Sequence, residues 1–219
     1  MAYIEKTIIA GEHIFKEKSF SARYGKKNIP RGPNWNECSE VQRRRNELLK
    51  KKRIVWNICT NFKKSDWWVT LTYRRSERPD SMVMAKKQRS RFIRRLREKL
   101  KKKDIPLTYT AMTERGVRGG LHHHFIIKNV FDIGIIISLW EHGKVHIENI
   151  YTDSMYDLAM YFVKGDSEKS EKDFTSSRNM KKPKIRRWRL CVPIRGDCRS
   201  AEELPMPMRP NFWKLAHLQ

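Results

Sequence analysis

The sequence lacks several features by which common classes of protein are recognised. No apolar run approaches the roughly 20 residues that span a bilayer, and the first segment, MAYIEKTIIAGEHIF, has no signal-peptide core, so we expect no membrane partner. The four cysteines form no C-x-x-C pair and no disulfide-dense pattern, which favours reduced thiols; a zinc site on Cys191 and Cys198 is the weaker alternative. No G-x-x-x-x-G-K-[ST] motif occurs, so no P-loop for ATP is expected.

Acidic residues are scarce relative to basic ones. The chain has 24 Asp and Glu against 48 Lys and Arg, which gives a formal net charge of +24 and an isoelectric point near 10.2. The excess recurs in RRRNELLKKKR, RRLREKLKKK and NMKKPKIRRWR. Solvated basic helix faces would explain any one run, but a recurrence along the whole chain predicts a polyanionic partner, most simply nucleic acid.

The hydrophobic pattern predicts one α+β domain. Residues 39–58 favour a helix capped by Ser39, residues 65–73 a strand, and residues 84–103 a helix whose apolar stripe contains Phe92 and Leu96. Residues 106–128 favour a β-hairpin; a helix in 132–143, a strand at 144–150 and a helix at 153–165, capped by Asp153 or Ser154 and closed by Gly165, follow. We expect a ferredoxin-like (RRM-like) split β-α-β fold with a central antiparallel sheet, helices on one face and the active site on the other.

The segment GLHHHFIIK places three histidines in one predicted strand. Because side chains alternate across a strand, His122 and His124 share one face, and His123 points to the other face with the apolar residues. A hairpin centred on Arg118 would put Glu114 directly opposite His122. Two imidazoles and a carboxylate suit a divalent ion with open coordination positions, rather than a closed structural zinc site. A chance polar patch is the alternative.

A nucleophile is suggested by MYFVKG. On a helix Tyr161 and Lys164 are neighbours, and a phenol of pKa about 10 needs a nearby ammonium group to act at neutral pH. Alone, Y-x-x-K is a weak signal. Tyr156 is five residues from Tyr161 and is expected to pack in the core. Trp35, Trp188 and Trp213 are also expected in the core, with base stacking as the alternative.

In this order, the segments WVTLTY, TERGVRGGLHHHFII and LAMYFVKG resemble the three motifs of the His-hydrophobic-His (HUH) endonuclease superfamily. They are most similar to the rolling-circle replication initiators of small bacterial plasmids and phages. The resemblance covers about residues 40–185, which leaves residues 1–39 and 186–219 as extensions of unknown role. The ordered set of motifs is specific, although each motif alone is not.

The resemblance implies a metal-dependent enzyme that nicks and rejoins single-stranded origin DNA through a 5′-phosphotyrosine. Tyr161 would be the single nucleophile and Lys164 its charge partner, while His122, His124 and, by a looser correspondence, Glu114 would hold Mg²⁺ or Mn²⁺. The residues expected to contact DNA are Thr70, Thr72, Arg178, Lys181 and Lys182.

The implied partners are single-stranded or hairpin origin DNA, a host helicase and a host polymerase, in the cytoplasm of a bacterial host. Two other functions remain open. A single-tyrosine transposase or relaxase shares the chemistry, and a non-enzymatic nucleic-acid-binding module would share only the positive charge.

Overall fold

The computed structural model describes residues 2–21, 39–116, 119–152, 154–164 and 172–190. In chain order the helices and strands are β1 (Ala2–Ala10), β2 (His13–Ser21), α1 (Glu40–Asn61), β3 (Trp67–Leu71), a 3₁₀ turn (Arg75–Glu77), α2 (Met82–Lys101), β4 (Tyr109–Arg115), β5 (Leu121–Ile127), α3 (Gly134–Leu139), β6 (Val145–Asn149), α4 (Met155–Val163), β7 (Lys172–Ser176) and β8 (Lys184–Leu190). Among the described helices, none is long and apolar enough to cross a membrane.

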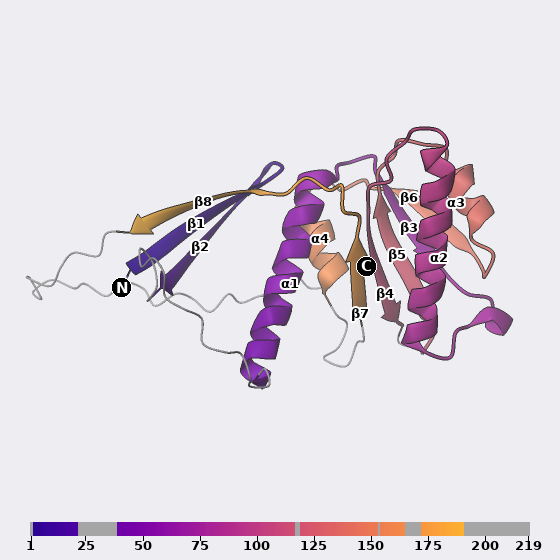
Figure 1. Ribbon diagram of the computed structural model, residues 1–219, viewed down its shortest axis with the longest axis horizontal. Helices are drawn as coiled ribbons and strands as arrows, with labels where there is room; N and C mark the ends of the chain where they lie inside the picture. Colours follow the sequence, from indigo (N-terminus) through magenta and orange to yellow (C-terminus); the bar gives the residue numbers. More distant parts are fainter. Residues whose placement is uncertain (1, 22–38, 117–118, 153, 165–171, 191–219) are drawn as a thin grey trace, which may run out of the picture.

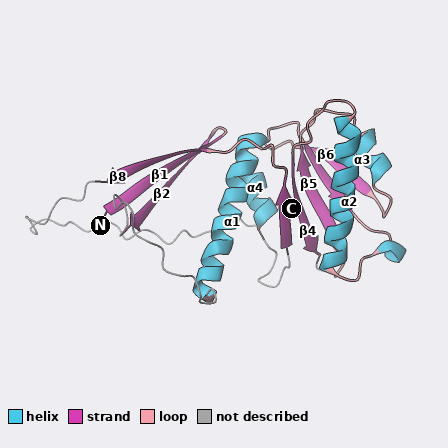
Figure 2. Ribbon diagram, viewed as in Figure 1, coloured by secondary structure: helices cyan, strands magenta, loops and turns pink. Residues whose placement is uncertain are grey.

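A central antiparallel sheet of five strands has the order β6-β3-β5-β4-β7 (Figures 1 and 2). From β3 to α4 the chain runs β, α, β, β, α, β, α, as the hydrophobic pattern predicts. The predicted α+β class with a central antiparallel sheet is therefore confirmed. Strand β7 joins the free edge of β4 and was not predicted.

Helices α2 and α3 cover one face of this sheet. Helix α2 begins after Ser81, whose side chain accepts a hydrogen bond from the Met84 backbone N–H and satisfies one of the free donors of the first turn. Its apolar stripe, including Phe92 and Leu96, is buried against Val69 and Phe125 of the sheet in one hydrophobic core. The predicted stripe is confirmed.

The opposite face is partly covered by α1 and α4. A second hydrophobic core joins Met112 and Ile126 of the sheet to Ile58 of α1 and Phe162 of α4. The predicted arrangement, with helices on one face only, therefore holds for α2 and α3 but not for these two helices. Their apolar faces need burial, and one row of apolar side chains on the second face of the sheet provides it.

A separate three-stranded antiparallel sheet, of order β2-β1-β8, packs against α1 at the end of the molecule away from α2 (Figure 1). Ile8 of β1 is fully buried in the second core, and Phe15 of β2 packs partly against it. The β1–β2 turn needs Gly11, with φ +60°, because a Cβ there would lie 2.2 Å from the Cys59 carbonyl oxygen. Neither this sheet nor its use of residues 1–39 was predicted.

The structure corrects the expectation for Trp188, whose side chain on β8 is 57% exposed rather than in the core. Trp35 and Trp213 lie outside the described residues, as do Cys191, Cys198, Asp153 and Gly165. The caps of α1 and α4 are Ser39 and Ser154, as predicted. Cys59 is buried and unpaired with another cysteine, and burial raises the pKa of its thiol to about 12, so it is an inert core residue.

Candidate active site

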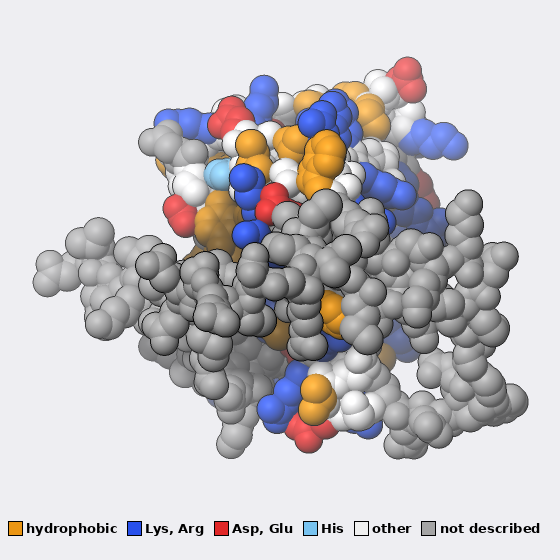
Figure 3. Space-filling model, turned by 90° about the vertical axis from the view of Figure 1, so that its left-hand side faces the viewer, with side chains coloured by type: hydrophobic (Ala, Val, Ile, Leu, Met, Phe, Trp, Pro, Cys, Tyr) orange, Lys and Arg blue, Asp and Glu red, His pale blue; other side chains and the backbone are white. Residues whose placement is uncertain are grey.

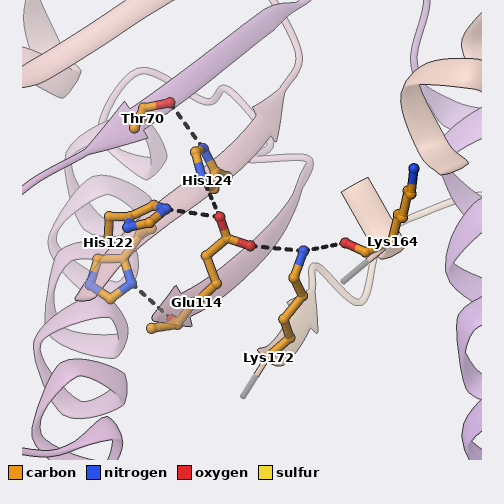
Figure 4. Close-up of polar contacts among 8 residues, drawn as sticks. Thr70, Glu114, His122, His124, Lys164 and Lys172 are labelled. Atoms are coloured by element: carbon orange, nitrogen blue, oxygen red, sulfur yellow. Dashed lines mark hydrogen bonds and ion pairs between the residues drawn. The ribbon is translucent and has the colours of Figure 1, made fainter. Parts of the chain in front are cut away.

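Glu114, His122 and His124 converge on the second face of the sheet. Glu114 Oε1 lies 2.8 Å from His122 Nε2 and 3.3 Å from His124 Nε2, and one potential ligand atom from each residue lies within 4.8 Å of the others (Figure 4). All three side chains are partly accessible, since their exposed fractions are 14, 22 and 16%. They form a compact group of donors that a ligand can reach.

The β4–β5 hairpin creates this arrangement. Glu114 pairs directly with His122, as the alternation argument predicts, and directly paired residues point to the same face. The connection is tight, with Gly119 at φ +77° and its N–H bonded to the Gly116 carbonyl. Gly116 also gives the ring of His122 its space, because a Cβ there would lie 3.0 Å from His122 Cε1.

Thr70 orients one of the two imidazoles. It pairs with His124 across β3 and β5, and its Oγ1 lies 3.0 Å from His124 Nδ1. With Nδ1 engaged in this way, Nε2 faces Glu114. A hydrogen bond on the second ring nitrogen is the usual support of a metal-binding histidine, because it fixes the tautomer and the ring orientation. The donor set and its support therefore fit a divalent metal ion.

Lys172 of β7 completes the polar cluster. Its Nζ lies 2.8 Å from Glu114 Oε2 and also donates to the main-chain carbonyl oxygen of Lys164 (Figure 4). Burial raises the pKa of Glu114, but hydrogen bonds from His122, His124 and Lys172 outweigh it and hold that pKa well below its usual range. The carboxyl group is therefore ionised at neutral pH, with Oε1 toward the histidines and Oε2 toward the lysine.

The position of Lys172 is fixed by its neighbour Asp173. Arg89 of α2 is 4% exposed and donates to the Asp173 carboxylate at 2.7 Å and to the Asp173 carbonyl at 3.1 Å. Lys86 adds an ion pair to the same carboxylate at 3.2 Å. These bonds tie β7 to α2 beside β4. Successive strand residues point to opposite faces, so Lys172 points toward Glu114.

Tyr161 and Lys164 lie beside the triad. With Met112, Glu114, His124 and Lys172 they line one pocket of about 80 Å³. Tyr161 is 67% exposed, and its ring lies 6.0 Å from that of Trp68 on β3. Helix α4 ends at Val163, and Lys164 is its C-cap, with a backbone N–H bonded to the Met160 carbonyl. The predicted pair thus opens on the same pocket as the predicted metal ligands.

His123 has a different environment, as the strand phase predicts. Its ring is fully buried on the α2 side, with Nε2 2.6 Å from Tyr73 Oη and Nδ1 2.8 Å from Thr113 Oγ1. Thr113 Oγ1 also accepts a hydrogen bond from Arg89. Burial lowers the pKa of His123 to about 3, and the charge of Arg89 contributes, so the ring is neutral. His123 supports the fold beneath the triad.

The other residues expected at the site have more varied surroundings. Thr72 donates to the Lys144 carbonyl at 3.2 Å, beside the triad strand. Arg178, Lys181 and Lys182 are exposed in the β7–β8 connection, which the side chain of Asn61 holds through both backbone groups of Lys181. Tyr156 packs 5.7 Å from Phe15, which confirms its expected core role. DNA contact by the four exposed or partly exposed residues stays a prediction.

Sequence reasoning missed Lys172. Its only sequence signal is its place in a polar, charged stretch, SEKSEKDF, which gives no indication of pairing with β4. The pairing Glu114↔Lys172 between the two strands is a tertiary feature. Spatial proximity, rather than a motif, adds this residue to the candidate site.

The fold and the site define an α+β domain with a two-histidine, one-carboxylate group that can hold a metal, beside an exposed tyrosine. Residues 66–166 match the model of the Replication-associated protein ORF2 family. The match runs from β3 to α4 and includes Glu114, His122, His124, Tyr161 and Lys164, but not Lys172. It covers just under half of the chain.

No curated protein and no solved structure matches the chain. The family match supports a replication-associated protein of the initiator class, and so a protein that binds DNA. The basic composition agrees with this assignment.

Proposed function

We propose that the protein initiates rolling-circle replication by nicking and rejoining single-stranded origin DNA. The observation that carries the proposal is the shared pocket: Tyr161 and Lys164 open on the same cavity as Glu114 and His124, inside the segment that matches a replication-associated family. A nucleophile, a cation and a metal-ligand group in one accessible place are the components that phosphodiester transfer needs.

Tyr161 is the proposed nucleophile. Its Oη attacks the scissile phosphorus and the bond from phosphorus to the 3′-oxygen breaks, which leaves the 5′-phosphate on the tyrosine. The phenol proton leaves to solvent, which the 67% exposure of Tyr161 allows, and the departing 3′-oxygen takes up a proton to become a hydroxyl group. Rejoining is the reverse attack of a 3′-hydroxyl on the phosphotyrosine. The energy of the phosphodiester bond is retained, so no ATP is required.

Glu114, His122 and His124 are the proposed holders of Mg²⁺ or Mn²⁺. Bound there, the ion would supply Lewis-acid chemistry by polarising the scissile phosphate. Thr70 keeps the His124 ring in place, and Lys172 keeps Glu114 Oε2 occupied so that Oε1 remains directed toward the histidines. Preset donors reduce the reorganisation that binding costs.

Lys164 is the proposed charge partner of the phenolate and of the transferring phosphate. Its position at the C-cap of α4 places it after Tyr161 on the wall of the same pocket. A fixed cation near developing negative charge lowers the barrier without a proton transfer. Strand separation is assigned to a host helicase or to an extruded hairpin, and synthesis from the released 3′-hydroxyl to a host polymerase.

The test is covalent capture of DNA. The purified protein is incubated with labelled single-stranded origin DNA and Mn²⁺, and the products are separated on a denaturing gel. The proposal predicts a protein–DNA adduct that requires the divalent ion and is absent from Tyr161→Phe. Binding of the same DNA without an adduct, across origin-derived oligonucleotides, would instead indicate a non-enzymatic DNA-binding module.

A further inference from the structure

The outer face of the β2-β1-β8 sheet carries exposed aromatic and basic side chains that the proposed site does not use. Ile8 and Phe15 point toward α1, so the alternate residues point away from it. On β8 these alternate residues are Lys184, Arg186 and Trp188, and on β2 they include Lys16, Lys18 and Phe20. All six are exposed; Trp188 is 57% and Phe20 53% accessible.

The strand register shows how these groups alternate. Arg186 and Lys16 flank Thr7 of the central strand, and Trp188 and Lys18 flank Glu5. Glu5 is the single carboxylate among the described side chains of this face, against four cations. Large exposed apolar rings are unfavourable in water, and a positive sheet face that displays them is suited to an anionic ligand with flat apolar groups.

The face is also connected to the candidate active site through the chain. Strand β7 brings Lys172 to Glu114, and the connection to β8 then carries exposed Arg178, Lys181 and Lys182 across the top of α1 and α4 (Figure 1). Figure 3 views this end of the molecule and shows Lys and Arg side chains interspersed with hydrophobic ones on the described surface. Positive charge thus continues from the site toward the outer face.

We propose that this face binds single-stranded DNA next to the nick site, with Trp188 stacking on a base and Lys16, Lys18, Lys184 and Arg186 contacting phosphates. Aromatic side chains among basic ones suit a single strand, because its unpaired bases offer free faces for stacking, whereas the bases of a duplex are already stacked. The inference rests on the proposed function only in taking DNA as the ligand, and it requires no cleavage.

The test measures binding without chemistry, by fluorescence anisotropy of a labelled oligothymidylate of about 30 nucleotides. Trp188→Ala should weaken binding by about 5- to 150-fold, the range for loss of one stacked base, and Trp188→Phe should restore most of it. Because Trp188 is exposed, thermal unfolding of both variants should match that of the parent protein.

A charge-reversal pair tests the phosphate contacts. Lys16→Glu with Arg186→Glu should reduce the slope of log affinity against log salt by about 1.4, which corresponds to two lost contacts to a single strand. The matched control is Lys87→Glu with Arg91→Glu on α2, which carries the same charge change on two exposed residues at the other end of the molecule. Equal loss in the two double variants would overturn the proposal.

Duplex DNA distinguishes stacking from a general charge effect. Trp188→Ala should leave affinity for a duplex of the same length within about two-fold, since no base face is free there. An equal loss for duplex and single strand would contradict the stacking role. If the parent protein forms no adduct on origin DNA but the Trp188 dependence is found, the proposed cleavage fails and this surface remains.

Discussion

Adjacent histidines on β5 should respond to mutation in opposite ways, and His123→Ala is the most informative change. The His123 ring is fully buried and lies within hydrogen-bonding distance of Tyr73 Oη and Thr113 Oγ1. Its removal loses hydrogen bonds worth about 0.5–1.5 kcal/mol each, leaves buried hydroxyl groups that cost about 1–3 kcal/mol each if unpaired, and opens a cavity. We expect a loss of about 3–5 kcal/mol in the free energy of unfolding.

The matched variant is His124→Ala. The His124 side chain is 16% exposed and ends in the polar cluster rather than in the core, so we expect a loss below about 1 kcal/mol. Urea denaturation measures both stabilities, and calorimetric titration with Mn²⁺ at low urea measures metal affinity. His123→Ala should retain Mn²⁺ binding where it is folded, and His124→Ala should lose it. If His124→Ala lost more stability than His123→Ala, or both lost Mn²⁺ equally, the strand phase would be wrong.

His123 should also contribute to acid sensitivity. In the folded protein burial lowers its pKa from 6.5 to about 3, so between these pH values the unfolded chain binds a proton that the folded protein excludes. This contribution to stability is fully present above pH 6.5 and falls as the pH is lowered toward 3. His123→Leu, which cannot titrate, should show a shallower decline of unfolding free energy over this range. An unchanged slope would refute a neutral, buried ring.

Three other changes address the site directly. His122→Ala should remove the divalent-ion dependence of adduct formation together with the adduct, while the thermal unfolding midpoint changes little; retained metal-dependent cleavage would count against the ligand set. Lys172→Met should raise the Mn²⁺ concentration needed for half-maximal cleavage, because Glu114 Oε2 loses its partner, and Lys172→Arg should recover part of the affinity; an unchanged Mn²⁺ requirement would mean that Lys172 only packs. Lys164→Ala should slow adduct formation by about 10²–10³-fold without abolishing it, as measured in single-turnover assays; an unchanged rate would remove Lys164 from the chemistry.

The local parts of the site could be predicted from the sequence. The alternation of GLHHHFIIK separates His123 from its neighbours, and a hairpin of fixed register puts Glu114 opposite His122, so short-range rules are sufficient. The α2 stripe and the Ser39 and Ser154 caps follow from equally local signals. These features depend on residues that are close in the chain.

The features that could not be predicted depend on pairing between distant segments. Lys172 reaches Glu114 because β7 joins the edge of β4, and no periodicity in the sequence names that partner. Similarly, β1 pairs with β8 from the far end of the described chain, which leaves Trp188 exposed on an outer face. Burial of a tryptophan is a reasonable expectation from its apolar area, but the strand register overrides it.

The central claim is that Tyr161 carries the DNA after cleavage, and mass spectrometry of the trapped adduct tests it most directly. Protein treated with origin DNA and Mn²⁺ is digested with protease and nuclease, and the nucleotide-bearing peptide is sequenced. The account predicts one phosphonucleotide on Tyr161, and its loss in Tyr161→Phe with single-strand affinity unchanged. A nucleotide on Tyr151 or Tyr156, or an adduct that persists in Tyr161→Phe, would contradict it.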